Sequence, residues 1–356
     1  MFCSFLDLFA FLKEMFILFN CLVLAAGEGT RMRSNCPKVL SEILHVPMLS
    51  WVLDSVFACK TKKCCVVTGF QSEKIDNFLK INGYNCETVF QKDRKGTAHA
   101  VMVAIDFIKK NSSEDILILG GDSPFVDPMT IMSAYECHKK EKNCATLISA
   151  KFSDPFGYGR IIRNRNGQVC AIVEEKEADK KQKYIQEINS GAYWFNSVEL
   201  INAIGSVHAN NTSGEFYLTS IISIFIKNNL KVGAFCSQDY VVALGANTSK
   251  QLKMLNEIAK NRVIKRFMSS GVNIPYNENI MISKNVEIGE GTTILSGVTI
   301  VASKIGKNCV IGPNTKLFGE NVPDGTNLMF HNTNVDFTKY LEKGDKFDNK
   351  AVNYAV

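Results

Sequence analysis

The twelve cysteines of this chain of 356 residues have no regular spacing, and this lack of a pattern is informative. No Cys-x-x-Cys pair occurs, and no cysteines and histidines have the spacing of a structural zinc site. Scattered cysteines of this kind are typical of a reduced, cytoplasmic protein, in which they serve as small apolar side chains. The sequence therefore argues against a disulfide scaffold and against a zinc domain.

The chain also lacks an apolar run long enough to cross a bilayer. Its apolar N-terminus has no basic start, and Asp7, Lys13 and Glu14 interrupt it. The uninterrupted part, residues 15–26, is too short for a membrane-spanning helix. We therefore expect no integral membrane span. Residues 17–26 are predicted to form a buried parallel strand, and residues 1–19 are assigned to an apolar N-terminal extension.

Neither sign of charge is in large excess, since 41 basic and 35 acidic residues give a net charge of +6. There is no long basic stripe, and the Lys-rich run at 174–183 is mixed in sign, which is typical of a solvated face. A mild positive excess suits an anionic small substrate at least as well as nucleic acid. We expect no nucleic-acid partner.

What is present, over residues 20–150, is an alternation of short apolar runs and helix-like segments. Buried strands are predicted at 21–27, 64–70, 115–122 and 144–150, and helices at 48–58, 72–80, 97–110 and 128–139. The alternation predicts a doubly wound α/β sheet, whose ligands bind beyond the carboxyl ends of the strands. Two runs end there in the turns AAGEG and GGD. The looser pattern of 157–245 predicts an insertion that covers the sheet.

The last third of the chain has a different period. After a helix predicted at 248–271, apolar residues recur every six positions, with one step of five: Ile282, Ile288, Ile294, Ile300, Ile305, Ile311 and Leu317. This hexapeptide repeat is typical of a left-handed parallel β-helix, here of two to three coils, and it fades after Leu317. We assign residues 248–276 to a linker helix, 277–332 to the β-helix and 333–356 to a polar tail.

The segment LAAGEGTRMRSNCPKVL, residues 24–40, combines bare backbone with positive charge. A Gly-rich turn directly after a strand lets backbone N–H groups approach phosphate oxygens. Met32 stands where the dinucleotide fingerprint needs its third glycine, and no Gly-Lys-Ser/Thr follows as in a Walker loop. The segment therefore predicts a phosphate-binding loop of another kind.

This loop resembles the signature L-A-A-G-x-G-T-R-M…P-K of sugar nucleotidyltransferases. Further motifs match in order: QKDRKGTAHA (91–100), LGGDSPF (119–125), FGYGRIIR (156–163), IVEEK (172–176), IQEINSGAYW (185–194) and SGEFYLTSII (213–222). Together they are similar to the family of the bifunctional N-acetylglucosamine-1-phosphate uridylyltransferase/glucosamine-1-phosphate acetyltransferase, GlmU, over residues 20–318. The resemblance implies a Rossmann-like nucleotide-diphospho-sugar transferase domain at 20–247, built on a doubly wound mixed sheet.

The activity that the resemblance implies is that of a UDP-N-acetylglucosamine pyrophosphorylase. UTP and N-acetylglucosamine 1-phosphate would give UDP-N-acetylglucosamine and pyrophosphate, for cell-wall precursor synthesis. The sugar phosphate attacks the α-phosphorus of UTP in line, so the protein supplies mainly alignment and charge neutralisation. No general base is needed, because the attacking phosphate is already an anion.

For the chemical step, the resemblance implies Mg²⁺ as the cofactor. Arg31 would neutralise the leaving pyrophosphate and Lys38 the phosphates near the reacting centre. Asp122 and Asn247 would be metal ligands, since two protein oxygens with phosphates and waters suit Mg²⁺. Plainer alternatives are a turn position for Asp122 and the N-cap of the 248–271 helix for Asn247.

The resemblance also implies a set of substrate contacts. Backbone of the two Gly-rich turns would face the nucleotide, an amide and a Gly-Thr pair would read the uracil, and a glycine, an acid and an amide would contact the sugar. The nucleotide contacts are Leu24, Ala25, Ala26, Gly27, Gly120 and Gly121. The uracil contacts are Gln91, Gly96 and Thr97, and the sugar contacts are Gly159, Glu174 and Asn189. Glu215, Tyr217 and Thr219 are further pocket candidates, with plain packing as the alternative.

Three positions depart from the family pattern. Glu28 stands where the family usually has Lys, Arg94 where Gln is usual, and Gly120 where the motif Tyr-Gly-Asp has Tyr. Glu28 places an acid near the phosphates. The departures bear on nucleotide affinity and leave both predicted metal ligands in place.

The resemblance implies a homotrimer formed through the β-helix, with UTP and a sugar 1-phosphate as substrates. We expect the acetyltransferase half to be absent, because only His331 follows the repeat and it lies outside the coil period. Two other readings of the chain stay open. One is a nucleotidyltransferase for a different nucleotide or sugar 1-phosphate, such as glucose 1-phosphate. The other is a non-catalytic regulatory subunit of the same fold.

Overall fold

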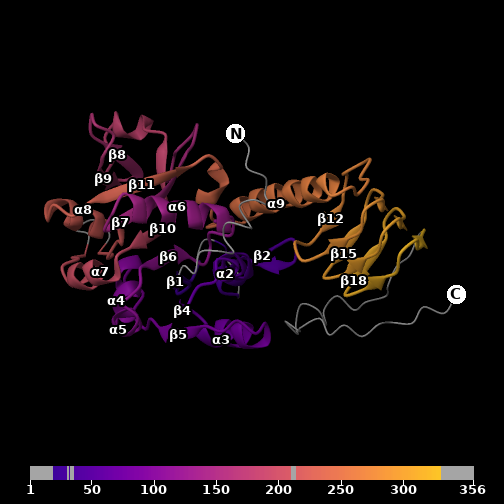
Figure 1. Ribbon diagram of the computed structural model, residues 1–356, viewed down its shortest axis with the longest axis horizontal. Coiled ribbons are helices and arrows are strands. Elements are labelled where there is room, and N and C mark those ends of the chain that lie inside the picture. Colours follow the sequence, from indigo (N-terminus) through magenta and orange to yellow (C-terminus); the bar gives the residue numbers. More distant parts are fainter. Residues whose placement is uncertain (1–18, 30–31, 33–35, 210–213, 330–356) are drawn as a thin grey trace. The chain divides into compact units, whose positions relative to one another are not determined.

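The computed structural model describes residues 19–29, 32, 36–209 and 214–329. These residues form two compact units (Figure 1). The first unit contains the described residues of 1–28, 49–72 and 85–244, and the second contains those of 29–48, 73–84 and 245–356. The domain boundaries assigned from the sequence remain a prediction.

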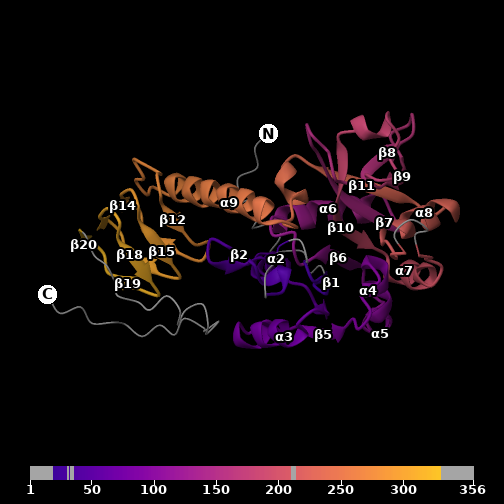
Figure 2. The same ribbon diagram turned by 180° about the vertical axis from the view of Figure 1, so that it is seen from behind.

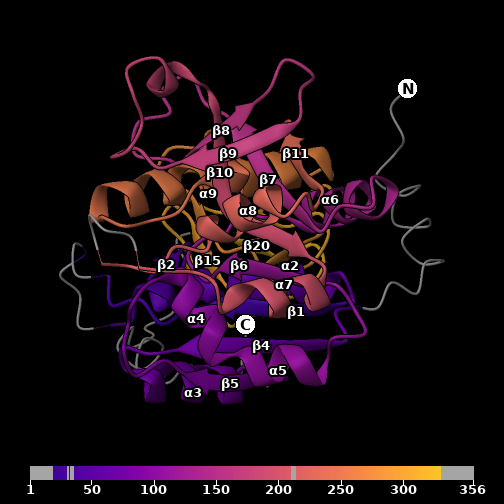
Figure 3. The same ribbon diagram turned by 90° about the vertical axis from the view of Figure 1, so that its left-hand side faces the viewer.

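A mixed sheet, nine-stranded over the described residues, forms the centre of the first unit. Seven strands follow the order β11-β7-β10-β6-β1-β4-β5, and a β8–β9 hairpin pairs with β10. Figure 3 shows this hairpin at the top of the view and β5 at the bottom. The strands are β1 (Asn20–Leu24), β4 (Lys63–Thr68), β5 (Glu87–Phe90), β6 (Ile116–Gly120), β7 (Ala145–Lys151), β8 (Arg160–Arg163), β9 (Val169–Val173), β10 (Glu187–Phe195) and β11 (Val232–Ser237).

The four strands predicted between residues 21 and 150 are confirmed as β1, β4, β6 and β7. Continuous apolar runs form them because both faces of these strands are covered, and Cys21, Leu22 and Val23 of β1 are fully buried. Among the main-sheet neighbours, β10 runs antiparallel to β6 and β7, while the other pairs are parallel. The predicted Rossmann-like mixed sheet is therefore confirmed.

The expectation that residues 157–245 only cover the sheet is wrong. β10 lies inside the sheet between β7 and β6, and β11 forms one of its edges. The side chains of β10 are buried on both faces: Tyr193 and Phe195 join one core, and Trp194 lies against Tyr135 with ring centroids 4.6 Å apart. An antiparallel strand with a bulge after Asn189 lacks the plain apolar run of the parallel strands.

Helices cover both faces of the sheet. Side chains of α4, α5, α7 and α8 join one core cluster with the face that carries Tyr193, and α6 packs on the opposite face at Trp194. The helices within the described residues are α2 (Met48–Ala58), α3 (Ser72–Ile81), α4 (Thr97–Val103), α5 (Ile105–Lys110), α6 (Pro128–Lys140), α7 (Ser197–Ile204), α8 (Thr219–Lys227) and α9 (Ser249–Ser269), with 3-10 turns η2 (Lys38–Leu40), η3 (Gln182–Tyr184) and η4 (Tyr240–Ala243). The helix predicted at 97–110 is two helices, because Ala104 leaves the helical conformation (φ −92°, ψ 12°).

The order of the parallel strands reverses at β1. The chain runs from β1 to β4 and β5 on one side and then crosses to β6 on the other side of β1. Leu24 is in register with Gly120, and the Gly121 N–H donates to the Leu24 carbonyl at 2.9 Å. Doubly wound sheets bind ligands outside the carboxyl ends of the strands at such a switch point. The two Gly-rich turns lie there together.

The second unit contains α9, the short strands β2 (Glu42–Ile43) and β3 (Val46–Pro47), and three parallel three-stranded sheets. The sheets are β12-β15-β18, β13-β16-β19 and β14-β17-β20 (Figure 2). Their strands are β12 (Met281–Ile282), β13 (Glu287–Ile288), β14 (Thr293–Ile294), β15 (Thr299–Val301), β16 (Lys304–Ile305), β17 (Val310–Ile311), β18 (Lys316–Phe318), β19 (Asn321–Val322) and β20 (Asn327–Leu328).

The seven apolar positions of the hexapeptide repeat all lie on these strands and pair in register. Ile282 pairs with Ile300 and Ile300 with Leu317, and the remaining repeat positions pair in the same way. Each strand pairs with the third one along the chain, an arrangement compatible with a β-helix, whose left hand stays a prediction. The repeat does not fade at Leu317, since β19 and β20 continue it with Val322 and Leu328.

No helix within the described residues is long and apolar enough to cross a membrane. The predicted tail at 333–356 and most of the predicted N-terminal extension lie outside the described residues.

Candidate functional site

The turn after β1 is held by backbone hydrogen bonds to β4 and to the residues that follow β4. The Ala25 N–H donates to the Val67 carbonyl at 2.8 Å, and the Ala26 carbonyl accepts from the Phe70 N–H at 3.2 Å. A Cβ atom at Gly27 would meet nothing within 4 Å, so the space above that backbone is open. The structure thus brings Leu24, Ala25, Ala26 and Gly27 to the switch point, as the sequence predicts.

Asp122 follows directly in the turn after β6, where the Ser123 N–H donates to the Gly120 carbonyl at 3.2 Å. A Cβ atom at Gly120 would lie 2.5 Å from Oδ1 of Asp122. The bare backbone of Gly120 therefore makes room for the carboxylate to lie over the turn. This is a structural reason for the absence of Tyr at position 120.

Gln91 directly follows β5 and is 3% exposed. Its N–H donates to the Thr68 carbonyl at 2.7 Å, which fixes the residue at the carboxyl edge of β4. Its Nε2 lies 2.8 Å from His99 Nδ1 and 3.3 Å from the Gly96 carbonyl oxygen. His99, on the first turn of α4, is a residue that sequence reasoning missed. Its position in the motif QKDRKGTAHA was the signal that could have found it.

Gly96 and Thr97 join the loop before α4 to the segment before α8. Gly96 has φ +105°, and a Cβ atom there would lie 2.6 Å from the Phe216 carbonyl oxygen. Thr97 Oγ1 accepts a hydrogen bond from the Leu218 N–H at 2.9 Å. Close packing against the Phe216 backbone therefore requires glycine at position 96, whatever its part in reading a base.

The three predicted sugar contacts lie together. The Asn189 N–H donates to the Gly159 carbonyl at 2.9 Å, and a Cβ atom at Gly159 would lie 3.3 Å from Glu174 Oε2. Glu174 Oε1 accepts from the Thr219 hydroxyl at 3.2 Å, and Asn189 Nδ2 donates to the Tyr193 hydroxyl at 2.6 Å. Burial raises the pKa of Glu174, against the opposing effect of the Thr219 hydrogen bond. The cluster offers amide and carboxyl groups to a polar ligand.

In the second unit, Lys38 Nζ donates to Asn247 Oδ1 at 2.6 Å, although 209 positions separate them. Thr248 is the N-cap of α9, and its side chain accepts from the Gln251 N–H at 3.2 Å. The alternative of Asn247 as that N-cap is therefore wrong. The Asn247 amide oxygen faces a cation instead.

The metal assignment is consistent with the chemistry of these donors, since a carboxylate and an amide oxygen suit a hard divalent cation. Asp122 belongs to the first unit and Asn247 to the second, so their joint role as metal ligands stays a prediction. Arg31 lies outside the described residues. Within the described part of the chain, no group of three or more His, Cys, Asp or Glu side chains forms a metal site.

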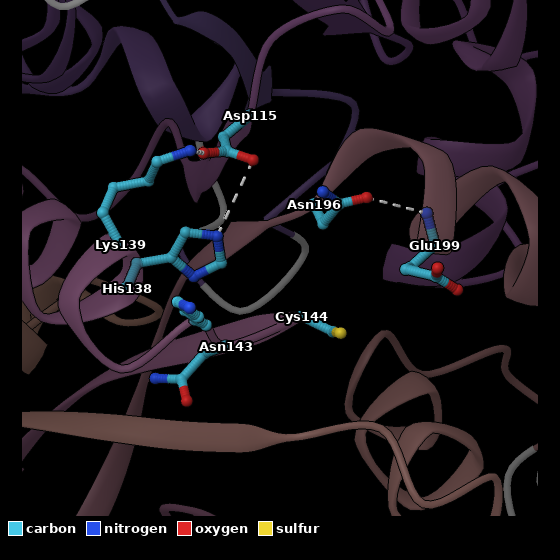
Figure 4. A pocket seen from close by; sticks show the side chains of 8 residues that line it. Asp115, His138, Lys139, Asn143, Cys144, Asn196 and Glu199 are labelled. Carbon is cyan, nitrogen blue, oxygen red and sulfur yellow. Dashed lines mark hydrogen bonds and ion pairs between the residues drawn. The ribbon is translucent and has the colours of Figure 1, made fainter.

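A cavity of about 290 Å³ lies at the other edge of the sheet, where β6 begins (Figure 4). It is lined by Asp115, His138, Lys139, Lys142, Asn143, Cys144, Asn196 and Glu199. Lys139 Nζ lies 2.8 Å from Asp115 Oδ2, and His138 Nε2 lies 3.8 Å from Asp115 Oδ1. Because Asp115 precedes β6 and Asp122 follows it, this cavity is separate from the switch-point site.

Asp115 makes stability depend on pH. Burial opposes its ionisation, but the nearby His138 ring and the hydrogen bond from Lys139 outweigh that effect and hold the pKa of Asp115 below its usual value. A lowered folded-state pKa stabilises the protein above the unfolded-state pKa of about 3.9, and this gain is lost as pH falls through the folded-state value. We expect Asp115→Asn to lower the free energy of unfolding by about 1–2 kcal/mol at pH 7.

Urea unfolding at pH 7 and at pH 3.5 tests this effect, with the exposed Asp76→Asn as the matched control. The difference between Asp115→Asn and the unchanged protein should shrink at the lower pH. A difference of equal size at both pH values would contradict the assignment.

A mixed α/β sheet that carries a Gly-rich turn and an acidic turn at its switch point defines a nucleotide-binding α/β protein. Residues 20–280 match the nucleotidyl transferase family, and the chain belongs to that family. Curated relatives include the bifunctional protein GlmU of Streptococcus gordonii, 37% identical over 252 residues, which cover 71% of this chain and 54% of that protein. The GlmU of Streptococcus agalactiae is 35% identical over 299 residues, or 84% of this chain and 61% of the relative.

Solved structures show the same fold. One, assigned as a glucose-1-phosphate thymidylyltransferase from Bacillus anthracis in complex with sucrose, matches with a TM-score of 0.54 and 20% identity, over 68% of this chain and 95% of that one. Apo UDP-glucose pyrophosphorylase matches with a TM-score of 0.57 and 15% identity, over 69% of this chain and 99% of that one. The chain is thus a member of the nucleotidyl transferase family whose relatives include bifunctional GlmU proteins, and it spans about half the length of the GlmU relatives named above.

Proposed function

We propose that this chain is a UDP-N-acetylglucosamine pyrophosphorylase, which transfers the uridylyl group of UTP to N-acetylglucosamine 1-phosphate and releases pyrophosphate. The observation that carries the proposal is the continuity of the predicted contacts within the first unit. Thr97, one of the predicted base contacts, accepts a hydrogen bond from the Leu218 N–H, and the next residue, Thr219, donates to Glu174 of the predicted sugar contacts. The nucleotide and sugar contacts therefore form one connected arrangement.

The nucleotide would lie on the backbone of residues 24–27. The backbone at Gly27 carries no side chain and has open space above it, so phosphate oxygens could approach the turn there without side-chain obstruction. The Gln91 amide, oriented by His99 and the Gly96 carbonyl, would pair with the uracil edge. Lys38 and Arg31 would neutralise phosphate charge, which aligns the sugar phosphate for in-line attack on the α-phosphorus.

Asp122 and Asn247 would hold Mg²⁺ in this proposal. When bound, the ion supplies charge neutralisation at the phosphates of the substrates. The carboxylate of Asp122 is held over the Gly120 backbone, and the Asn247 amide oxygen already accepts from the Lys38 ammonium group. Both are oxygen donors of the class that Mg²⁺ prefers.

The sugar would be read by Gly159, Glu174 and Asn189. The two ends of the Asn189 amide are fixed, since Nδ2 donates to Tyr193 and Oδ1 accepts from the Gly191 N–H at 3.2 Å. Preorganised polar groups disfavour a substrate that leaves them unpaired, so they select among sugar 1-phosphates. A trimer formed through the second unit, and the absence of the acetyltransferase site, stay predictions; His331 lies outside the described residues.

A panel assay tests the proposed activity. The purified chain, with Mg²⁺ and UTP, should release pyrophosphate with N-acetylglucosamine 1-phosphate at a kcat/KM at least tenfold above that with glucose 1-phosphate or with other nucleotides. A preference for another sugar or nucleotide would favour the alternative of a nucleotidyltransferase for a different nucleotide or sugar 1-phosphate. Absence of pyrophosphate release with every pair, from folded protein that binds UTP, would favour the regulatory-subunit alternative.

A further inference from the structure

Two of the three departures from the family pattern form one ion pair. Arg94 Nη2 lies 2.8 Å from Glu28 Oε2, although 66 positions separate these residues. Glu28 follows Gly27 in the turn after β1, and Arg94 lies in the loop between β5 and α4, three residues after Gln91. The pair therefore spans from the predicted phosphate-facing turn to the predicted base-facing loop.

The surroundings of the pair belong to the same edge of the sheet. The Arg94 guanidinium lies 5.7 Å from the centre of the Phe70 ring, and the Phe70 N–H donates to the Ala26 carbonyl at 3.2 Å. Arg94 thus contacts both the residue that follows Gly27 and the residue that supports Ala26. The stacked contact limits the positions that the guanidinium can take while it faces Glu28.

Charge gives this contact a consequence for phosphate binding. A lone carboxylate next to a phosphate-binding turn repels a triphosphate, whereas a carboxylate paired with a guanidinium contributes little net charge. The two side chains are 41% and 40% exposed, so as a simple surface ion pair they would add little to stability. If the pair serves the nucleotide site, its loss should change nucleotide affinity and leave the stability of the protein unchanged.

We propose that Arg94 is a positioning residue of the nucleotide site, which acts through Glu28 by neutralising its carboxylate and drawing it toward the base-facing loop. The proposal rests on the proposed function, in which a nucleoside triphosphate lies on the turn at residues 24–27. It also explains how an acid is accommodated at position 28. The two departures compensate each other and form one unit.

The test is the affinity for UTP with Mg²⁺, measured by calorimetry and as KM, together with the thermal unfolding midpoint. Arg94→Gln should weaken UTP binding about tenfold, because Glu28 is left unpaired. Glu28→Gln combined with Arg94→Gln should return the affinity to within twofold of the unchanged protein. The midpoint should stay the same in all variants. Lys95→Gln is the matched control, since it removes an exposed cation of the same loop and should have no effect.

Two results would overturn the proposal. One is unchanged affinity in Arg94→Gln, and the other is a double variant as weak as Arg94→Gln alone, which would mean that Arg94 acts on the nucleotide without Glu28. Failure of the unchanged protein to bind UTP would instead overturn the proposed function, and this proposal with it. If Arg94→Gln does not fold, the exchanged pair Glu28→Arg with Arg94→Glu gives the same test, because the pair is kept and its affinity should remain within about threefold.

Discussion

Replacing Asp122 by Asn is expected to lower kcat for pyrophosphate release about a thousandfold, or by about 4 kcal/mol of transition-state stabilisation. Asn has nearly the same shape as Asp, but it lacks the negative charge and carries an NH2 donor in place of one carboxylate oxygen. The turn around Gly120 should therefore keep its hydrogen bond to the Ser123 N–H. The loss would reflect the missing carboxylate at the switch point, and KM for UTP should rise less than kcat falls.

The matched control for this prediction is Asp127→Asn. Asp127 lies five residues further on and caps α6, where its side chain accepts from the Thr130 N–H at 3.0 Å and from the Thr130 hydroxyl at 2.8 Å. Its replacement should reduce stability by less than about 1 kcal/mol and leave turnover unchanged. Steady-state assays over a range of Mg²⁺ concentrations measure both variants. Normal turnover in Asp122→Asn would remove Asp122 from the catalytic assignment.

Much of the first unit could be predicted because its local signals and its tertiary structure agree. The parallel strands are covered on both faces, and this burial produces the continuous apolar runs from which β1, β4, β6 and β7 were predicted. Strand β10 escaped prediction for the opposite reason. Its sequence EINSGAYWF mixes polar and aromatic residues and carries a bulge, and only its neighbours determine its place in the sheet.

Local sequence likewise predicted only part of the candidate site. Motifs predicted Gly27, Gln91 and Asp122 one at a time, and the order of the strands brings their turns to one edge. Contacts between distant residues gave no local signal, and these include the hydrogen bonds from Leu218 to Thr97 and from Lys38 to Asn247. Glu28 and Arg94 each conflicted with the pattern alone, because the compensation exists only in the folded protein.

Arg160 is a buried residue to which the sequence gave no role, although it lies in the motif FGYGRIIR. It is 1% exposed, and its Nη2 donates to Glu175 Oε2 at 2.6 Å, while Nη1 donates to the Tyr158 carbonyl. Glu175 Oε2 also accepts from the Gly157 N–H at 3.1 Å. The hydrogen bond from Arg160 holds the pKa of Glu175 below its usual value.

This ion pair stands directly beside the predicted sugar contacts. Arg160 follows Gly159 in the chain, and Glu175 follows Glu174. The pair therefore fixes the spacing of two residues that would face the sugar, in a β8–β9 hairpin whose register places Arg160 opposite Val173. Loss of the guanidinium would leave Glu175 without its main partner and the Tyr158 carbonyl without its donor.

We expect Arg160→Met to lower the free energy of unfolding by about 2 kcal/mol, because the partly exposed Glu175 loses its charged hydrogen-bond partner while the side-chain volume is nearly kept. KM for the sugar 1-phosphate should rise about tenfold, and KM for UTP should change less than twofold. Lys183→Met is the control, since it removes a half-exposed cation 3.9 Å from the same carboxylate and should shift stability by less than about 0.5 kcal/mol. Urea unfolding and initial rates with each substrate varied in turn give both quantities. Equal increases of the two KM values would show that Arg160 supports the whole unit. An unchanged KM for the sugar 1-phosphate would show that this ion pair does not position the sugar contacts.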